Sequence, residues 1–293
     1  MKISVLVTNW NGLSLLQKNL ETIIQKSPEA EEIILADDYS SDDSLLFAKK
    51  LQKKYPKLKI VSRSKNFGFG SNSNNAVQKS TGDLVVLLNN DIVPHSKYIT
   101  NSLKHFSDPK VFGVGFAEFN NENWARYFWK DGYLQHEPGI TKLNKTHISG
   151  WVSGGSSIIR KNLFEKLGGF DQIYEPFYSE DLDLGYRAWK SGYTILWEPK
   201  SVVEHKHETT MSKFSVIFLN YVKERNRLLN TWRNITDTRL LSQNNIALIG
   251  RVLSGPNYIK IIRAAKRQIK KSGPPIVFPK FTDQEIFNKF KND

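Results

Sequence analysis

The stretch Leu84-Val85-Val86-Leu87-Leu88-Asn89-Asn90-Asp91 is an apolar run that ends in two amides and a carboxylate. A strand that is apolar on both faces is typical of the interior of a parallel sheet. In open α/β sheets, ligands bind beyond the carboxyl ends of the strands. Asp91 is therefore a candidate ligand-binding residue, although Asn90-Asp91 could equally begin a turn ahead of Pro94.

Around this stretch, the first hundred residues alternate between strand-like and helix-like segments. We expect strands at 3–8, 32–36, 58–62 and 83–88, and helices at 13–26, 44–55 and 72–80. Such alternation predicts the α/β class, with a parallel sheet and crossover helices. The polar loops 8–12, 37–42 and 66–72 follow three of the strands and should converge on one edge of the sheet.

Length and composition exclude several classes of site. The chain has 293 residues, of which 39% are hydrophobic, enough for one large core or for one domain and an appendage. It has no cysteine, which excludes disulfides, thiolate zinc sites and cysteine nucleophiles, so oxygen or imidazole must hold any metal. Because we find neither a signal-peptide core nor an apolar stretch of membrane-spanning length, we expect a cytoplasmic protein that is soluble or peripheral to a membrane.

Several short motifs occur in an order and spacing typical of one enzyme family. They are 5–12 (VLVTNWNG), 36–42 (ADDYSSD), 66–70 (NFGFG) with Asn74, 88–91 (LNND), 154–156 (GGS) and 180–184 (EDLDL). In them the chain resembles the family 2 glycosyltransferases, which are inverting nucleotide-sugar enzymes with the GT-A fold, and in particular the rhamnosyltransferase-like members of polysaccharide assembly. The resemblance implies a single Rossmann-like mixed sheet flanked by helices.

The resemblance also implies a division of the chain. It covers residues 1–235, which would form the glycosyltransferase domain. Residues 1–95 would be the half that binds the nucleotide sugar, and residues 96–235 the half that binds the acceptor. Residues 236–293 would form a basic helical extension.

For the donor, the resemblance implies a UDP- or dTDP-sugar. Thr8, Trp10 and Asp38 would contact the base, with Asp38 accepting the imide N–H of uracil or thymine. Asp37-Asp38 could instead cap the next helix, for which Asp42 is better placed. The full set of implied donor-binding residues is Thr8, Asn9, Trp10, Asp38, Asn66, Gly68, Asn74, Asn90 and Asp91. The glycine-rich stretch 66–74 would let the backbone approach the diphosphate or ribose, and a purely structural loop is an equally good interpretation.

A divalent cation, Mn²⁺ or Mg²⁺, is the cofactor that the resemblance implies. Asn89-Asn90-Asp91 stands where the family has its Asp-x-Asp metal motif, so Asp91 would be the main ligand. Such a cation would neutralise the departing nucleoside diphosphate. His205 matches the position of a family histidine near the metal, and a structural role for this histidine is equally open.

A second acidic cluster, Glu180-Asp181-Leu182-Asp183, falls in the first turn of a predicted helix. Without the resemblance it is a plain acidic helix start, which the helix dipole favours. The resemblance implies that Asp181 is the catalytic base and that Glu180 places the acceptor or the base.

The resemblance places the acceptor beside Trp151, Gly154 and Gly155, although Trp151 could equally be a core residue. The aromatic stretch 119–139 either lines the acceptor site or forms a small buried insertion.

The net charge of +13 is concentrated near the C-terminus, since residues 238–282 contain lysine and arginine but no acidic residue. Within 255–272, Tyr258, Ile261, Ile262, Ala265 and Ile269 form one helical face and basic residues the other. This pattern suits an interfacial helix on an anionic membrane, and equally a helix packed on its own domain with a solvated basic face. The sequence 282–286 is a capping-box start to a short terminal helix.

These observations predict a metal-dependent inverting glycosyltransferase that moves a sugar to a hydroxyl of a glycan or lipid-linked acceptor in cell-surface polysaccharide synthesis. Two rival functions remain. A sugar-nucleotide pyrophosphorylase would carry a glycine-rich signature with Arg and Lys near the N-terminus, which residues 7–11 lack. A nucleic-acid-binding module would explain the charge, but the basic residues lie in a tail without such a motif, so we expect no nucleic-acid partner.

Overall fold

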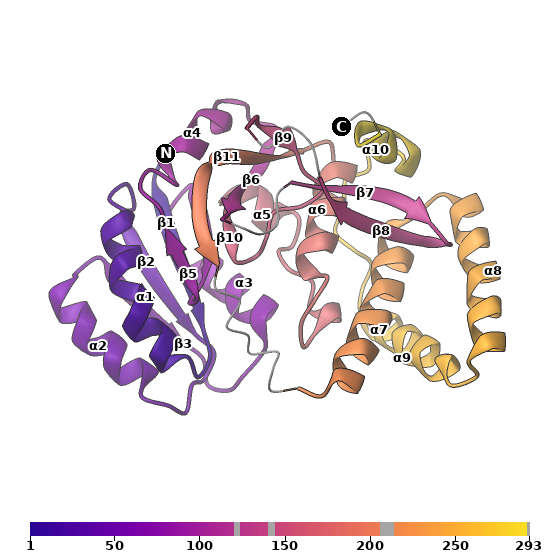
Figure 1. Cartoon of the computed structure of the whole chain (residues 1–293), viewed down its shortest axis with the longest axis horizontal. Coiled ribbons are helices and arrows are strands. Elements are labelled where there is room, and N and C mark those ends of the chain that lie inside the picture. The colour runs from indigo at the N-terminus through magenta and orange to yellow at the C-terminus, as the bar shows by residue number, and fades with distance from the viewer. Residues whose placement is uncertain (120–123, 140–143, 206–213, 292–293) are drawn as a thin grey trace.

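The computed structural model describes residues 1–119, 124–139, 144–205 and 214–291. Within them, a nine-stranded sheet with helices on both faces forms the centre of the molecule (Figure 1). Its strand order is β3-β2-β1-β4-β10-β6-β11-β5, and β9 pairs with β11. The strands are β1 Ile3–Asn9, β2 Glu32–Asp37, β3 Leu58–Ser62, β4 Leu84–Asn89, β5 Ile92–Pro94, β6 Val111–Glu118, β9 His147–Ile148, β10 Ser156–Arg160 and β11 Thr194–His205.

The first half of the sheet is parallel, as predicted. Strands β3, β2, β1 and β4 pair in register and are joined by the helices α1 Leu13–Lys26, α2 Ser44–Lys54 and α3 Phe69–Lys79. Successive residues of β4 point into two different cores: Val86 packs with residues of α1 and α2, and Val85 with residues of α3. The continuous apolar run of this strand therefore reflects burial on both faces. Helix α3 begins already at Phe69, earlier than the predicted residue 72.

The second half of the sheet is mixed. Strand β10 runs antiparallel to β4 and β6, β11 runs parallel to β6, and β5 closes the edge antiparallel to β11. The helical elements here are α4 Thr100–Leu103, η1 Lys104–Ser107, α5 Lys161–Lys166, η2 Gln172–Tyr174 and α6 Glu180–Lys190. The strands β7 Ala125–Lys130 and β8 Tyr133–Pro138 form a separate hairpin. Tyr127 and Tyr133 within these strands are buried, and so is Trp124 directly before β7. The described part of the aromatic stretch 119–139 is thus a small packed insertion.

The C-terminal part of the chain is helical, as predicted. It contains α7 Val216–Asn234, α8 Thr238–Ser254, α9 Tyr258–Lys271 and α10 Asp283–Lys289. Helices α7, α8 and α9 gather at one end of the molecule (Figure 1), and the capping box at Thr282 and Glu285 opens α10. The mixed α/β sheet with a helical C-terminal part, predicted from the sequence, is confirmed.

The apolar face of α9 packs on the protein itself. Ala265 is fully buried, and Tyr258, Ile261, Ile262 and Ile269 pack around it against Leu228 and Leu229 of α7. Of the two interpretations of 255–272, the packed helix with a solvated basic face is the one that the structure shows. In the described residues, no helix is both long and apolar enough to cross a membrane.

Candidate functional site

A cavity of about 640 Å³ opens where the carboxyl ends of the first parallel strands meet the start of α6. Most of the residues predicted to bind or react line it, although they come from seven separate segments. These residues are Thr8, Asn9, Trp10, Asp38, Asn66, Gly68, Asn90, Asp91, Gly154, Gly155, Glu180, Asp181 and His205. The two acidic clusters, which are far apart in the sequence, therefore face one space.

The floor of the cavity is a network of amides at the ends of β1 and β4. Nδ2 of Asn90 donates to Oδ1 of Asn9 at 2.7 Å, and Nδ2 of Asn9 donates to Oδ2 of Asp37 at 2.9 Å. Gly155 lies so close that a Cβ there would come within 2.3 Å of the Asn89 amide. Asn89 and Asn90 thus build the floor, and Asp91 is the carboxylate that this motif presents to the cavity.

Asp38, beside this floor, fastens the glycine-rich loop to the end of β2. Its Oδ2 accepts the N–H of Gly68 at 2.8 Å, and both of its oxygens accept the N–H of Phe67 at 3.1 Å. Burial raises the pKa of Asp38 above its usual value, against the effect of these hydrogen bonds. Asp38 therefore holds the loop and still borders the cavity. The N-cap residue of α2 is Asp43 and not the predicted Asp42, although Oδ1 of Asp42 accepts the N–H of Ser44, the first residue of the helix, at 3.1 Å.

Asp91 lies beside His205, which comes from the end of β11. Nε2 of His205 is 3.1 Å from Oδ1 of Asp91, and Nδ1 is 3.1 Å from Oε1 of Glu118. Burial alone would lower the pKa of His205, but the two carboxylates outweigh it and raise this pKa to about 9. Glu118 had no signal in the sequence, because its role depends on the pairing of β6 with β11.

The Asp91 and His205 pair offers donors that suit a hard or borderline cation. Oδ1 of Asp91 is buried, and its contact with the described residues is the ion pair with Nε2 of His205. An oxygen and an imidazole nitrogen fit Mn²⁺ or Mg²⁺ when phosphate oxygens and water complete the shell. Within the described ranges, no cluster of three or more acidic or histidine side chains forms a complete protein cage for a metal.

Glu180 and Asp181 begin helix α6 on the opposite side of the cavity. Burial, and then the neighbouring charge of Asp181, raise the pKa of Glu180 to about 8. Its Oε2 is buried and has no hydrogen-bond partner among the residues that the structure describes. Glu180 therefore carries a proton over much of the neutral pH range.

The loop ahead of α6 has an unusual backbone that α7 holds in place. Tyr178 and Ser179 have φ values of 73° and 75°, in the left-handed region that residues with a side chain seldom adopt. Nδ2 of the buried Asn226 donates to the carbonyl oxygens of Tyr174, Phe177 and Tyr178 at 2.9, 2.9 and 2.7 Å. One amide thereby fixes the turn that aims Glu180 and Asp181.

Aromatic side chains line the cavity beside the start of α6. Phe177, Tyr178 and Phe214 line it, and the Phe177 ring lies 5.2 Å from that of Phe214 and 6.2 Å from that of Phe218. We did not predict these residues as site residues, although Phe177 and Tyr178 directly precede the acidic cluster. Phe214 and Phe218 lie more than thirty residues later, and no motif connects them to the site.

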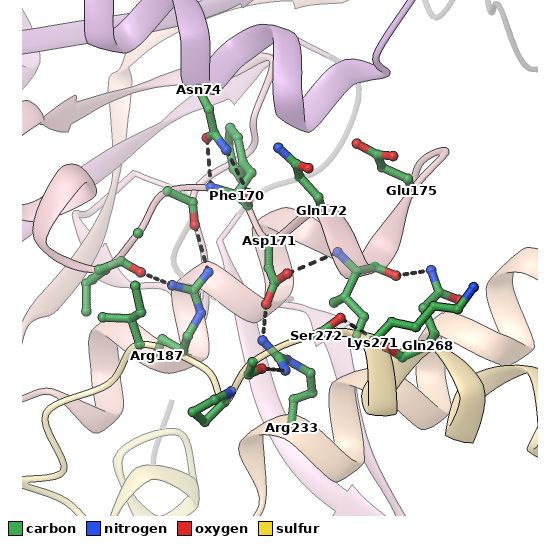
Figure 2. A pocket seen from close by; sticks show the side chains of 17 residues that line it. Asn74, Phe170, Asp171, Gln172, Glu175, Arg187, Arg233, Gln268, Lys271 and Ser272 are labelled. Carbon is green, nitrogen blue, oxygen red and sulfur yellow. Dashed lines mark hydrogen bonds and ion pairs between the residues drawn. The ribbon is translucent and has the colours of Figure 1, made fainter.

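Two of the predicted site residues lie outside this cavity. Asn74 points at the backbone of Phe170 (Figure 2), donating to its carbonyl oxygen at 2.8 Å and accepting its N–H at 2.9 Å. Asn74 borders another cavity, of about 530 Å³, which lies between the loop at Phe170 and the end of α9. Trp151 packs against Gly185 and the ring of Tyr127. The structure therefore gives both side chains a packing role.

Comparison with known proteins places this geometry in a family. The family model described as Glycosyl transferase family 2 matches residues 4–168. The chain is 26% identical over 221 residues to the O-antigen chain rhamnosyltransferase RfbN of Salmonella typhimurium, covering 72% of this chain and 68% of that protein. It is also 26% identical to the rhamnosyltransferase WbbL of Escherichia coli, covering 85% and 98% of the two chains.

A relative that matches over a shorter stretch and two solved structures agree with this family and its fold. An N-acetylglucosaminyl-diphospho-decaprenol L-rhamnosyltransferase of Mycobacterium tuberculosis is 32% identical over 105 residues, which are 35% of this chain and 32% of that protein. A GalNAc-T7 structure with UDP, GalNAc and Mn²⁺ has a TM-score of 0.63 at 15% identity, covering 84% of this chain and 55% of that chain. A mannosyltransferase from Pyrobaculum calidifontis with GDP-Man and Mn²⁺ has a TM-score of 0.59 at 16% identity, covering 92% and 80%. The predicted GT-A fold is thus confirmed.

Proposed function

Because the chain belongs to the family Glycosyl transferase family 2, we propose that it is a metal-dependent inverting glycosyltransferase of cell-surface polysaccharide synthesis. It would move a sugar from a UDP- or dTDP-sugar to a hydroxyl of a glycan or lipid-linked acceptor. The observation that carries this proposal is the single cavity that contains Asp91 and His205 on one side and Glu180 and Asp181 on the other. Rhamnosyltransferases among the relatives support an activated sugar as donor.

The donor would bind at the ends of β1, β2 and β4. Asp38 would accept the imide N–H of the base beside Trp10, and the loop at Gly68 would let the backbone approach the ribose and diphosphate. Asp91 and His205 would hold Mn²⁺ or Mg²⁺, whose positive charge stabilises the departing diphosphate. The raised pKa of His205 means that its ring must lose a proton to become a ligand.

Transfer would occur between the two sides of the cavity. Asp181 takes the proton of the acceptor hydroxyl while that oxygen attacks the anomeric carbon from the side opposite the nucleoside diphosphate. A C–O bond forms as the C–O bond to the diphosphate breaks, so the configuration at the anomeric carbon inverts. Glu180, protonated at neutral pH, would donate a hydrogen bond to the acceptor or to Asp181.

A screen of UDP- and dTDP-sugars with and without Mn²⁺ tests this function. We expect Mn²⁺-dependent release of the nucleoside diphosphate from at least one donor, and a loss of release in the Asp181→Asn protein. Pyrophosphate-dependent formation of a nucleoside triphosphate would instead identify a pyrophosphorylase. Absence of turnover and of binding with every donor would contradict the proposal.

A further inference from the structure

Helix α8 carries an apolar stripe on its outer face. Ile246, Ile249 and Leu253 recur at helical spacing and are exposed by 70%, 61% and 79%. Gly250, between them on the helix surface, has no atom within 4 Å of the position that a Cβ would take. The other face of α8 supplies Leu248 and Asn244 to the interior. This helix is therefore apolar on both sides, which its packing alone does not require.

Helix α9 places a basic surface next to this stripe. Since its apolar face is packed against α7, its charged residues are left on the solvent side. The exposed basic residues are Lys260, Arg263, Lys266, Arg267, Lys270 and Lys271. No acidic residue occurs between positions 238 and 282, and the neighbouring carboxylate of Glu224 in α7 is paired with Arg251 and Tyr258. This basic surface attracts a multiply anionic partner rather than a neutral one.

A second apolar feature connects this end of the molecule with the cavity. Val216 and Ile217, in the first turn of α7, are exposed by 71% and 83%. They follow Phe214, which lines the cavity. In Figure 1 the start of α7 and the turn between α8 and α9 both lie along the lower edge of the molecule. These exposed aliphatic residues thus lie within three positions of a residue that lines the cavity.

We propose that these features form one docking surface for an anionic phospholipid bilayer. The docking surface consists of Val216 and Ile217, the α8 stripe of Ile246, Ile249 and Leu253, and the basic residues of α9. Aliphatic side chains would enter the headgroup and acyl boundary while the α9 cations lie among anionic headgroups. This membrane contact differs from the interfacial helix considered for 255–272, because α8 and not α9 supplies its apolar side chains. The inference rests on the proposed function, since a lipid-linked acceptor would present its sugar at such a surface.

Vesicle flotation with the full chain tests the docking surface. We expect co-flotation with phosphatidylglycerol-containing vesicles, weakened by salt, and no co-flotation with phosphatidylcholine alone. Lys266→Glu/Arg267→Glu/Lys270→Glu should lower the partition coefficient at least about tenfold. Ile246→Ser/Ile249→Ser/Leu253→Ser should lower it by a similar factor. Because all six side chains are in solvent or only half-buried, both variants should fold, which circular dichroism checks.

A matched control sits at the other end of the molecule. Lys49→Glu/Lys50→Glu/Lys53→Glu changes three exposed lysines of α2 and shifts the net charge equally. This variant should keep at least about half of the vesicle binding, because its charges lie outside the docking surface. An equal loss in the control would overturn the proposal, since net charge would then suffice.

Other occupants give distinct outcomes. If the α8 stripe instead joins two copies of the chain, light scattering will show a dimer that the α8 variant dissociates, without vesicle binding. Retention of nucleic acid by the basic face, again without vesicle binding, would equally reject the bilayer. A protein that transfers sugar to a water-soluble acceptor, with release of the nucleoside diphosphate, but does not bind vesicles rejects this inference alone. One that binds vesicles but turns over no donor rejects the proposed function alone.

Discussion

The proposed donor side and the proposed acceptor side of the cavity are built on different supports. On the donor side, Asn9 and Asn90 stand at the ends of parallel strands and bond to each other across the sheet. On the acceptor side, Glu180 and Asp181 follow a loop whose left-handed residues are fixed by Asn226 of α7. The sheet holds the first set directly, whereas one amide from another helix holds the second.

Because the supports differ, the turn ahead of α6 can move independently of the strand ends. A shift of α7 would move the turn at Tyr178 and Ser179 and re-aim Glu180 and Asp181, while the amide network at the strand ends would stay. Mutations on the two sides should therefore separate into effects on donor binding and effects on turnover. The following changes probe that separation.

The largest effect is expected for Asp181→Asn. An amide cannot take the proton of the acceptor hydroxyl, so kcat should fall by about 10² to 10⁴. Donor affinity, measured by calorimetry with Mn²⁺, should change less than about threefold, because Asp181 lies on the acceptor side. Normal turnover in this variant would show that Asp181 is not the base.

Asp91→Ala should act on the other side. Loss of its carboxylate removes an expected metal ligand, and metal-dependent donor affinity should fall by about 10- to 100-fold. Calorimetric titration of the donor with and without Mn²⁺ measures the effect. Unchanged affinity in the presence of the metal would place the cation elsewhere.

A matched pair of buried asparagines tests the two supports. Asn226→Ala leaves the carbonyl groups of Phe177 and Tyr178 without their donor, while that of Tyr174 keeps its hydrogen bond from Arg225. It should lower kcat by about tenfold, with little change in the donor KM. Asn72→Ala removes an amide whose Nδ2 donates to the carbonyl of Ala36 at 2.8 Å, at the end of β2. It should raise the donor KM more than it lowers kcat. The same kinetic pattern in both variants would remove the distinction between the two sides.

The smallest effect is a change in the pH dependence of stability. The pKa of Glu180 rises from 4.5 to about 8 on folding, so its protonated form stabilises the fold. That contribution is fully present below about pH 4.5 and disappears as the pH rises through about 8. Glu180→Gln should therefore gain stability relative to the parent as the pH rises. Thermal unfolding across this pH range measures it, and parallel curves for the two proteins would contradict the assignment.

Sequence reasoning found most of the donor side because its side chains follow strands. Apolar runs locate the strands, parallel pairing brings their carboxyl ends together, and so Asp38 and Asp91 could be placed in one cavity. Asn74 sits in the same glycine-rich stretch, but a helical position turns its side chain toward Phe170. A motif gives the neighbourhood of a residue and not the direction of its side chain.

The rest of the site was less predictable because long-range contacts shape it. Glu118 reaches His205 only through the pairing of β6 and β11, and Asn226 reaches its loop across about fifty positions of the chain. The hydrophobic face of α9 was visible in its periodicity, but periodicity does not say what covers a face. The structure shows that α7 covers the hydrophobic face of α9.

The buried ion pair between Lys190 and Asp283 has a consequence for synthesis of the chain. Nζ of Lys190, at the end of α6, lies 2.6 Å from Oδ1 of Asp283, and both side chains are nearly inaccessible to solvent. The same carboxylate accepts the backbone N–H groups of Thr236 and Asp237. While the ribosome still encloses residue 283, the ammonium group of Lys190 has no counter-ion and cannot be buried cheaply. The helix that begins with Glu180 and Asp181 should thus settle only after residue 283 has emerged, later than the parallel strands.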